Sequence, residues 1–357
     1  MFELRIEDSK RRKERESLKE KSMATVNITL IANELKIAPS TVSRALKKPE
    51  MVSLETRQKV LKAAEKLGYL QKLRDNATVG TSHNLVGVIV ADLTNFFSNQ
   101  IVKAVNDLLL ENKISTIVGC TYENSALESN LLKQWAGLNL KGLIVMPTNK
   151  FSKSMSVLGD KMPVVLVDRE DHSIKCDTVI EDNCQGSFQA LEYLRELGHK
   201  KIAFISGNHN VYTFAERCRG AEQSPLDVET IELKAQGYEE LYIEAFEQTN
   251  IMLMRSVSSR PTAIVGANNA ITAGVLYALS LKGLKIPQDM SVISYGDNDW
   301  CRFYPTPITS VCQPVEEMGR TAAQLLLDRI QEPTRDFSKV CLKSMLLNRA
   351  STDKPNR

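Results

Sequence analysis

The sequence predicts a small all-α head followed by an α/β core that contains two parallel sheets. Three short segments with helical periodicity lie between Ile28 and Gly68, and from Leu85 onward apolar, β-branched runs alternate with amphipathic segments of helical length. Continuous β-branched strands separated by helices are typical of parallel sheets covered on both faces. The chain has 357 residues, of which 43% are hydrophobic and 25% charged, and this length suits two or three globular domains. Two doubly wound lobes therefore fit the core better than one.

The first two predicted helices flank a short break. Apolar side chains follow a helical period from Ile28 to Leu35, and the break "KIA" occupies residues 36–38. Pro39 suits the first position of the second helix, because its missing N–H would have no partner there in any case. The second helix directs three apolar side chains inward: Val42, Ala45 and Leu46. Small polar and basic residues are left on its exposed face.

The third predicted helix begins after Ser53 and ends at Gly68. Ser53 is a suitable N-cap, Glu55 lies in the first turn, and glycine is the residue most often found just beyond a helix C-terminus. Two helices joined by a tight turn, the second of them basic, predict a helix-turn-helix. The composition alone is equally compatible with a solvated basic helix in a small bundle.

The core is predicted from seven apolar runs and the segments between them. These runs occupy residues 85–90, 115–119, 142–146, 163–167, 201–206, 262–266 and 291–295. We divide the chain into a charged, disordered extension (1–22), a helix-turn-helix domain (23–69), a polar linker (70–84) and the core (85–357). A second methionine, Met23, is an alternative start.

Positive charge is concentrated near the N-terminus. Residues 23–80 contain 10 Lys and Arg against 5 Asp and Glu, although the whole chain has a net charge of only +3. A polyanionic partner is therefore expected to bind the head, and in the second helix Arg44 can pair with a guanine edge or a phosphate. Lys47 and the basic residues of the third helix would lie nearer the phosphate backbone.

Several other classes of protein are disfavoured. No segment approaches the ~18–20 uncharged apolar residues that span a bilayer, and the N-terminus lacks the apolar region of a secretory signal, so we expect a cytoplasmic protein without a membrane partner. Seven scattered cysteines without a CxxC pair indicate reduced structural thiols, and the four histidines form no metal-binding pattern. No Walker A, GxSxG or GxGxxG motif occurs, so neither a cofactor nor an enzymatic activity is predicted.

The head resembles that of the lactose/galactose repressor (LacI/GalR) family of transcription regulators. The stretch "TVSRALKKPEMVSLETRQKVLKAAEKLGY" (41–69) carries the resemblance without a gap. By position, it implies that Pro39 and Ser40 contact bases at the start of the recognition helix and that Thr41, Ser43 and Arg44 contact DNA. Two departures stand out: Lys36 and Ala38 replace the usual Gly and Ser of the turn, and Thr78 occupies the position of a minor-groove leucine in the linker.

The core resembles the same family over nearly all of its length. The stretches "VGVIVADLTNFFSNQI" (86–101), "VVLVDR" (164–169) and "VIEDNCQGSFQALEYLRELGHKKIAFISG" (179–207) match its first half, and residues 267–299 and 305–330 match its second. The resemblance implies a fold of the periplasmic-binding-protein type, with two doubly wound lobes, three crossovers and an effector cleft at the carboxyl ends of the strands. The segment 221–236 is shorter than its counterpart in the family.

Six residues are predicted to contact the effector from the positions that they match. They are Asp92, Phe97, Arg169, Arg217, Asn268 and Asp297. An aromatic face suits a sugar ring or a base, and an arginine fork suits hydroxyls, a carboxylate or a phosphate. Two alternatives stay open: the phenylalanines at 96 and 97 could belong to the core, and Arg169 could form a structural ion pair with Asp168.

The departures within the core bear on the chemistry of the ligand. The usual AND motif is Ala267-Asn268-Asn269 here, and Gly296 replaces the first carboxylate of the motif that ends in Asp297. Loss of a carboxylate beside Arg217 and Arg302 gives the hypothesis of an acidic or phosphorylated ligand. A sugar or a sugar acid is the expected effector class.

The sequence thus predicts a ligand-responsive, sequence-specific DNA-binding transcriptional regulator, a repressor of carbohydrate genes. It would bind a pseudo-palindromic operator as a homodimer, because two heads at a fixed spacing engage both half-sites. No Leu heptad follows "RAST" (349–352), which favours a dimer over a tetramer. The alternatives are a sugar-binding protein with the same core and, less favoured, a sugar-modifying enzyme with a DNA-binding head.

Overall fold

The computed structural model describes residues 28–69, 84–155, 158 and 162–356. It divides into two compact units, a head (up to Ser82) and a core (from His83). The extension 1–22, the alternative start at Met23, Thr78 and nearly all of the predicted linker lie outside the described residues. No helix among the described residues is long and apolar enough to cross a membrane.

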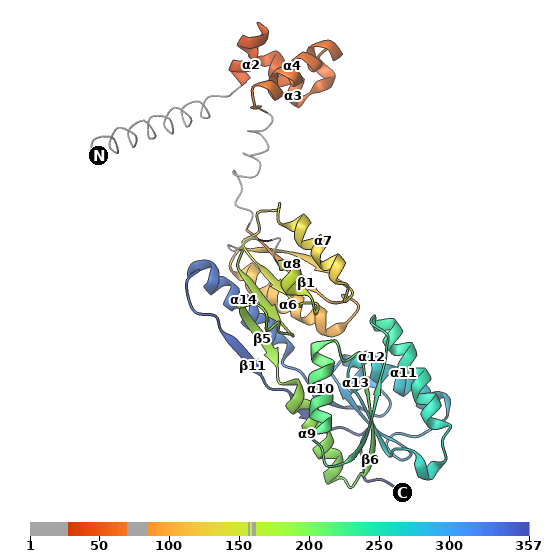
Figure 1. Cartoon of the computed structure of the whole chain (residues 1–357). Helices are drawn as coiled ribbons and strands as arrows, with labels where there is room; N and C mark the ends of the chain where they lie inside the picture. The colour runs from red at the N-terminus through yellow and green to blue at the C-terminus, as the bar shows by residue number, and fades with distance from the viewer. Residues whose placement is uncertain (1–27, 70–83, 156–157, 159–161, 357) are drawn as a thin grey trace, which may run out of the picture. The chain divides into compact units, whose positions relative to one another are not determined.

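The head consists of three α-helices around a small apolar core (Figure 1). They are α2 (Ile28–Leu35), α3 (Pro39–Lys47) and α4 (Leu54–Lys66), with a 3₁₀ turn at Pro49–Met51. All three helices contribute to the buried cluster, which contains Ile31, Ala32, Val42, Ala45, Val60, Ala63 and Ala64. The predicted inward face of the second helix is confirmed, with Leu46 packed against the edge of this cluster.

The N-termini of α3 and α4 in the head are capped differently. Ser53 accepts a hydrogen bond from the Thr56 N–H at 3.3 Å, as expected for the N-cap of α4. Ala38 occupies the same position before α3 and provides no side-chain bond. Lys36, two residues before Ala38, has a φ of 53°, which is the left-handed conformation in which glycine is usually found. The turn before α3 is therefore formed without the two residue types that usually stabilise it.

The core contains two six-stranded sheets in the described residues, each in its own lobe. The N-lobe sheet has the order β11-β5-β4-β3-β1-β2, and all of its strand pairs are parallel. The C-lobe sheet has the order β12-β10-β9-β8-β6-β7, in which only the β10–β12 pair is antiparallel. The N-lobe strands are β1 (Leu85–Val90), β2 (Ser115–Cys120), β3 (Leu143–Val145), β4 (Val164–Val167), β5 (Asp177–Glu181) and β11 (Lys339–Leu342). The C-lobe strands are β6 (Lys201–Ser206), β7 (Asp227–Glu232), β8 (Ala263–Gly266), β9 (Ser291–Tyr295), β10 (Thr309–Cys312) and β12 (Met345–Leu347).

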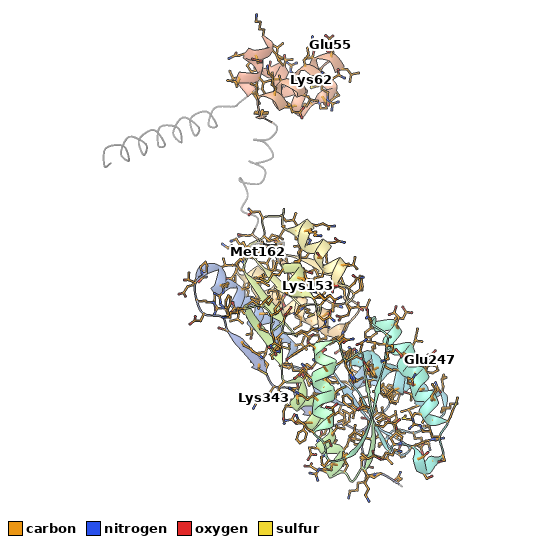
Figure 2. All side chains as sticks on the ribbon, in the orientation of Figure 1. Glu55, Lys62, Lys153, Met162, Glu247 and Lys343 are labelled. Atoms are coloured by element: carbon orange, nitrogen blue, oxygen red, sulfur yellow. The ribbon has the colours of Figure 1, made fainter. Side chains whose placement is uncertain are left out.

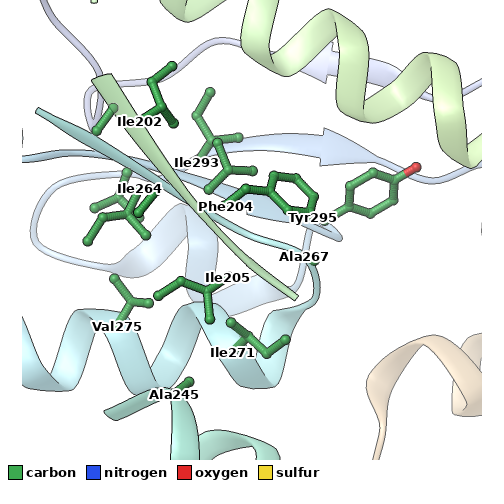
Figure 3. Packing of buried hydrophobic residues seen from close by; sticks show 14 of the residues in the cluster. Ile202, Phe204, Ile205, Ala245, Ile264, Ala267, Ile271, Val275, Ile293 and Tyr295 are labelled. Atoms are coloured by element: carbon green, nitrogen blue, oxygen red, sulfur yellow. The ribbon is translucent and has the colours of Figure 1, made fainter. Parts of the chain in front are cut away.

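Helices cover both faces of each sheet, as predicted (Figure 1). In the N-lobe, α6 (Phe96–Glu111) and α14 (Val315–Gln331) cover one face, and α7 (Ser125–Trp135) and α8 (Phe151–Met155) cover the other. The C-lobe helices are α9 (Asn183–Glu196), α10 (Tyr212–Glu222), α11 (Tyr238–Leu253), α12 (Asn269–Leu281) and the short α13 (Asp299–Phe303), and a 3₁₀ turn covers Val257–Ser259. The core of the C-lobe packs Ile202, Phe204 and Ile293 on one face of the sheet, with Tyr295 at the carboxyl end of β9 (Figure 3).

Three segments of the described core cross between the lobes. The first is Asp182, between β5 and α9; the second is residues 313–314, between β10 and α14; the third is residues 343–344, between β11 and β12. Lys343, in the third crossover, is labelled where the two lobes meet in Figure 2. The two lobes can therefore rotate relative to each other only by bending these three short segments together.

The expected strands are all present, and five further strands were not predicted. β5, β7, β10, β11 and β12 are short or carry charged residues, so they lack the continuous apolar run that identified the others. β7 and β11, at or near sheet edges, are only half-buried along their length, which explains their mixed composition.

Candidate functional site

A cleft between the two lobes brings together all six residues that were predicted to contact an effector. It lies at the carboxyl ends of the strands and contains ≈ 1120 Å³ of space, its open mouth included. The structure therefore gathers the predicted residues at one place, whereas their contact with a ligand stays a prediction.

Asp92 and Phe97 form part of the N-lobe wall. The Asp92 carboxylate accepts hydrogen bonds from the backbone N–H and the hydroxyl of Thr94, at 2.8 and 2.7 Å, so one of its oxygens holds the loop after β1. Asn95 caps α6 by accepting from the Phe97 N–H at 3.1 Å. Phe97 is half-buried against the N-lobe core and also lines the cleft, so the two roles considered for it are compatible.

Arg169 is held in an ion-pair network. Its guanidinium donates two hydrogen bonds to Glu123, at 2.7 and 2.6 Å, and one to Asp168 at 3.3 Å. The alternative of a structural ion pair with Asp168 is confirmed, but the principal partner is Glu123, which the sequence did not identify. Glu123 is brought to the cleft by a turn in which it and Tyr122 both have positive φ. Such a turn between non-glycine residues leaves no recognisable signal in the sequence.

Asp168 is a buried carboxyl group with an unusual titration. Burial raises its pKa to about 6, although the Arg169 and Arg217 guanidiniums act in the opposite direction. Its φ of 73° places it in the left-handed region, where Asp is one of the few tolerated residue types. This combination of burial and backbone strain at a cleft is typical of functional sites.

Arg217 lies in the C-lobe wall and is almost fully buried. Its Nε donates to Asn183 at 2.7 Å, and its Nη1 donates to the Ala267 carbonyl at 2.8 Å. The guanidinium stacks 3.8 Å above the ring of Tyr295, and its Nη2 lies 3.8 Å from a carboxylate oxygen of Glu181. Burial, and then the Glu181 carboxylate, raise the pKa of Tyr295 well above its ordinary value, so this phenol stays protonated and donates to Glu181.

Asn268 and Asp297 differ in how much of their polar capacity is used internally. Asn268 caps α12 by accepting from the Ile271 N–H at 2.8 Å, and its amide nitrogen has no bond to another described residue. The Asp297 carboxylate accepts two bonds from Arg349, at 2.6 and 2.8 Å, and further bonds from Ser310 and Arg302. Burial alone would raise the pKa of Asp297, but the bonds from Arg349 and Ser310 lower it overall. The Asp297 carboxylate is therefore already bound by other side chains of the protein.

Asn269 was not predicted, and it spans the cleft. Its amide nitrogen donates to Asn298 at 3.1 Å and to Asn95 of the N-lobe at 3.4 Å. Its Oδ1 is buried and has no hydrogen-bond partner among the described residues. This oxygen is covered by surrounding protein atoms, so a ligand hydroxyl can donate to it only after the cleft lining shifts.

Other lining residues also escaped the sequence analysis. They include Asn208, Phe214, Ala235, Gln236, Tyr238, Tyr295 and Gln313. Ala235 and Gln236 follow the end of β7 by three and four residues, so the short segment 221–236 still forms a wall of the cleft. Among the residues that the structure describes, no group of three or more His, Cys, Asp or Glu side chains could hold a metal ion.

The predicted DNA-contacting residues lie along α3 of the head. Pro39, Ser40 and Arg44 are exposed, and Thr41 and Ser43 are half-buried; the side chain of Lys47 lies outside the description. Arg44 donates weakly to the carbonyl and the hydroxyl of Ser40, at 3.3 and 3.5 Å. Exposed basic residues also lie on α4, where Figure 2 labels Lys62, and Lys59 there pairs with Glu55 at 2.7 Å. These side chains have few internal partners.

Comparisons with protein families match both parts of the chain. Residues 27–71 match the model of bacterial regulatory proteins of the lacI family, and residues 191–352 match the model of a periplasmic binding protein-like domain. The first match covers the whole described head, and the second covers most of the C-lobe together with α14 and β11 of the N-lobe.

Curated relatives and solved structures extend this likeness over the rest of the chain. The probable HTH-type transcriptional regulator EndR of Paenibacillus polymyxa is 30% identical over 87% of this chain and 92% of its own length. The ribose operon repressor of Haemophilus influenzae is 26% identical over 90% of this chain and 97% of its own length. A LacI family transcriptional regulator from Enterococcus faecalis, solved with bound ribose, is 25% identical with a TM-score of 0.68, over 76% of this chain and 99% of its own. This chain belongs to the lacI family of bacterial transcription regulators.

Proposed function

We propose that this regulator binds a neutral sugar in the interlobe cleft and that the bound sugar changes the affinity of the head for its operator. The observation that carries the choice of ligand is the pairing of charges in the cleft. Both guanidiniums that line it already face a carboxylate, Arg169 at 2.6 Å from Glu123 and Arg217 at 3.8 Å from Glu181.

This pairing bears directly on the hypothesis of an acidic or phosphorylated ligand. That hypothesis needs a cation free to meet the ligand, and Arg302, which was expected to contribute, instead contacts Asp297 at 3.2 Å and does not line the cleft. The lining contains four carboxylate residues (Asp92, Glu123, Asp168 and Asp297) and only two arginines. An anionic ligand would meet net negative charge, so a neutral ligand is favoured.

The remaining free polar groups suit hydroxyls. The amide nitrogen of Asn268 can donate to a ligand, and Oδ1 of Asn269, which is covered in this structure, can accept from one after the cleft lining shifts. A sugar hydroxyl both donates and accepts, so one type of ligand group satisfies both atoms. Phe97, Phe214 and Tyr238 supply apolar lining against which a sugar ring can pack.

DNA is assigned to α3. In this proposal Pro39, Ser40, Thr41, Ser43 and Arg44 enter the major groove, and Lys47 approaches a phosphate. The support is the exposed, basic surface of a helix whose opposite face is buried in the head. Such a protein acts in the cytoplasm, bound to the nucleoid.

A homodimer on a pseudo-palindromic operator is the proposed assembly. An apolar strip on α11 and α12 supports it, with Ile251, Met254 and Leu281 each more than half exposed and Ile243 and Tyr277 nearly so. Residues 243, 247 and 251 recur every four positions, so they share one helix face, where Figure 2 labels Glu247. A second copy covering this strip would join two heads in one molecule, and two half-sites require two heads.

The test is selection of DNA by the purified full chain, followed by binding measurements with sugars. Ligands are offered as matched sets, such as D-ribose with D-ribonate and ribose 5-phosphate, and D-glucose with D-gluconate and glucose 6-phosphate. We expect one neutral sugar to change the DNA affinity by about fivefold or more, and its acid to have no effect. A response confined to acids or phosphates would contradict the neutral-ligand proposal. Asn268→Ala should remove the response and leave DNA binding intact, which separates the two sites.

A further inference from the structure

One buried carboxylate contacts the second and third crossovers and stands at the start of the first. Glu181 is the last residue of β5, directly before the first crossover, and its side chain is fully buried. One oxygen accepts from the Gln313 amide, in the second crossover, at 2.5 Å, and the other accepts from the Ser344 hydroxyl, in the third. The adjacent backbone adds a further link, because the Asp182 N–H donates to the Leu342 carbonyl at 2.9 Å.

The same carboxylate extends toward the cleft. It accepts from the Tyr295 hydroxyl at 2.6 Å and lies 3.8 Å from Nη2 of Arg217. Figure 3 shows the Tyr295 hydroxyl pointing away from Phe204 and the apolar core of the C-lobe. The fit around this hydroxyl is tight: a Cβ at Gly186, in the first turn of α9, would lie only 2.5 Å from it. Arg217 lies over the ring of the same tyrosine, so the cleft wall and the crossovers share one network.

We infer that Glu181 is a positioning residue that joins Arg217 to all three crossovers. Its two oxygens already serve Gln313, Ser344, Tyr295 and Arg217, and a buried carboxylate that loses such partners is strongly destabilised. The crossovers therefore cannot rearrange without moving Tyr295 and Arg217, and a ligand that moves Arg217 acts on the crossovers. This inference uses the proposed function only in treating the cleft as the ligand site.

Glu128 provides a matched control. Among the residues that the structure describes, it is the other fully buried glutamate, and it accepts from the Thr148 N–H and hydroxyl at 2.8 and 2.9 Å. Thr148 lies in the N-lobe, and Glu128 does not line the cleft. Glu128→Gln therefore alters a buried carboxyl group without touching a crossover.

The test is hydrogen exchange of the full chain, without DNA or sugar. Gln313→Glu places a second carboxylate against Glu181, and we expect exchange to accelerate about tenfold in residues 312–316, 182–186 and 342–345 and in α10 around Arg217.

The double variant Glu181→Gln/Gln313→Glu exchanges the two groups, so it restores the donor–acceptor pair and a single negative charge. Its exchange in the three crossovers should return to within about threefold of the unmodified chain. Glu128→Gln should change exchange only near Thr148.

Two results would overturn the inference. Acceleration confined to residues 312–316 in Gln313→Glu would show that the crossovers move independently, and a double variant as fast as Gln313→Glu would show that the pair itself is unimportant. If Gln313→Glu fails to fold, Glu181→Gln serves instead, because it keeps an acceptor for Tyr295 and Ser344 but removes the charge facing Arg217. We then expect faster exchange around Arg217 and in the crossovers, and unchanged exchange would contradict the inference. No DNA or sugar is involved, so this result and the test of the proposed function can fail separately.

Discussion

The proposed recognition helix, α3, and the interlobe cleft use their polar side chains in opposite ways. On α3, Ser40 and Arg44 are exposed and contact little except each other. In the cleft, Arg169, Arg217 and Asp297 are buried or half-buried, and each is held by several partners within the protein. A surface that meets a charged polymer benefits from free side chains, whereas a small-ligand site benefits from side chains fixed in advance. Mutations on α3 should therefore weaken DNA binding, whereas mutations of these cleft residues should lower the stability of the fold.

The largest expected effect is on the stability of the core. Asp297→Ala leaves Arg349 without its carboxylate partner in a half-buried position, and we expect the free energy of unfolding to fall by about 3 kcal/mol. Both tryptophans, Trp135 and Trp300, belong to the core, so urea unfolding followed by tryptophan fluorescence reports on the core alone. Lys59→Ala, which removes an exposed ion pair of the head, is the control and should change nothing in this signal. An unchanged free energy of unfolding in Asp297→Ala would contradict the view that the cleft side chains are held by partners within the protein.

Asp168 should give the core a pH dependence of stability. Its pKa of about 6 lies above the value in an unfolded chain, so the folded state binds the proton more tightly and this carboxyl lowers stability as the pH rises from about 4 to about 6. Asn tolerates the same positive φ, so Asp168→Asn should keep the backbone conformation at this position. It should also remove the loss of stability that ionisation of Asp168 causes. The stability of the variant relative to the unmodified chain should therefore rise by about 2–3 kcal/mol between pH 4 and pH 7. A difference that does not vary with pH would mean that Asp168 is ionised normally.

On the head, the expected effect is on affinity. Arg44→Ala should weaken binding to the selected DNA by about 1–3 kcal/mol and change the stability of the head by less than about 0.5 kcal/mol, because its side chain is exposed. Fluorescence anisotropy over a salt series measures the first quantity. Arg44→Lys separates two contacts: affinity is retained if Arg44 meets a phosphate and is lost if it binds a guanine edge through its fork. Loss of head stability in Arg44→Ala would show that the residue is structural.

The smallest effect concerns the two helix caps of the head. Ala38 has the extended backbone of an N-cap but no capping side chain, so Ala38→Ser should stabilise α3 by up to about 1 kcal/mol. Ser53→Ala should destabilise α4 by a similar amount, since it removes the bond to the Thr56 N–H. Amide exchange of the two helices in the full chain measures both changes. Slower exchange in α3 without a change in DNA affinity would show that the missing cap affects only folding.

The sequence predicted the fold and the location of the site better than the chemistry of the site. Apolar runs such as 85–90 and 201–206 identify parallel strands because both of their faces are buried, and residues that follow such strands meet at one edge. Partner choice depends on distant segments: Arg169 pairs with Glu123, 46 positions away, and Glu181 meets Ser344, 163 positions away. No local pattern encodes these contacts. The sequence shows that Arg302 is close to Asp297 along the chain. It does not show that the ion pair between them keeps Arg302 out of the cleft.

The central claim is that the head and the cleft are energetically coupled, and reciprocal binding measurements test it most directly. The dissociation constant of the responding sugar is measured by calorimetry with and without saturating operator DNA, and that of the DNA with and without saturating sugar. Linkage requires the two ratios to be equal, and we expect both to be about fivefold or more. A sugar that binds the core with the same dissociation constant whether or not DNA is present would contradict the account.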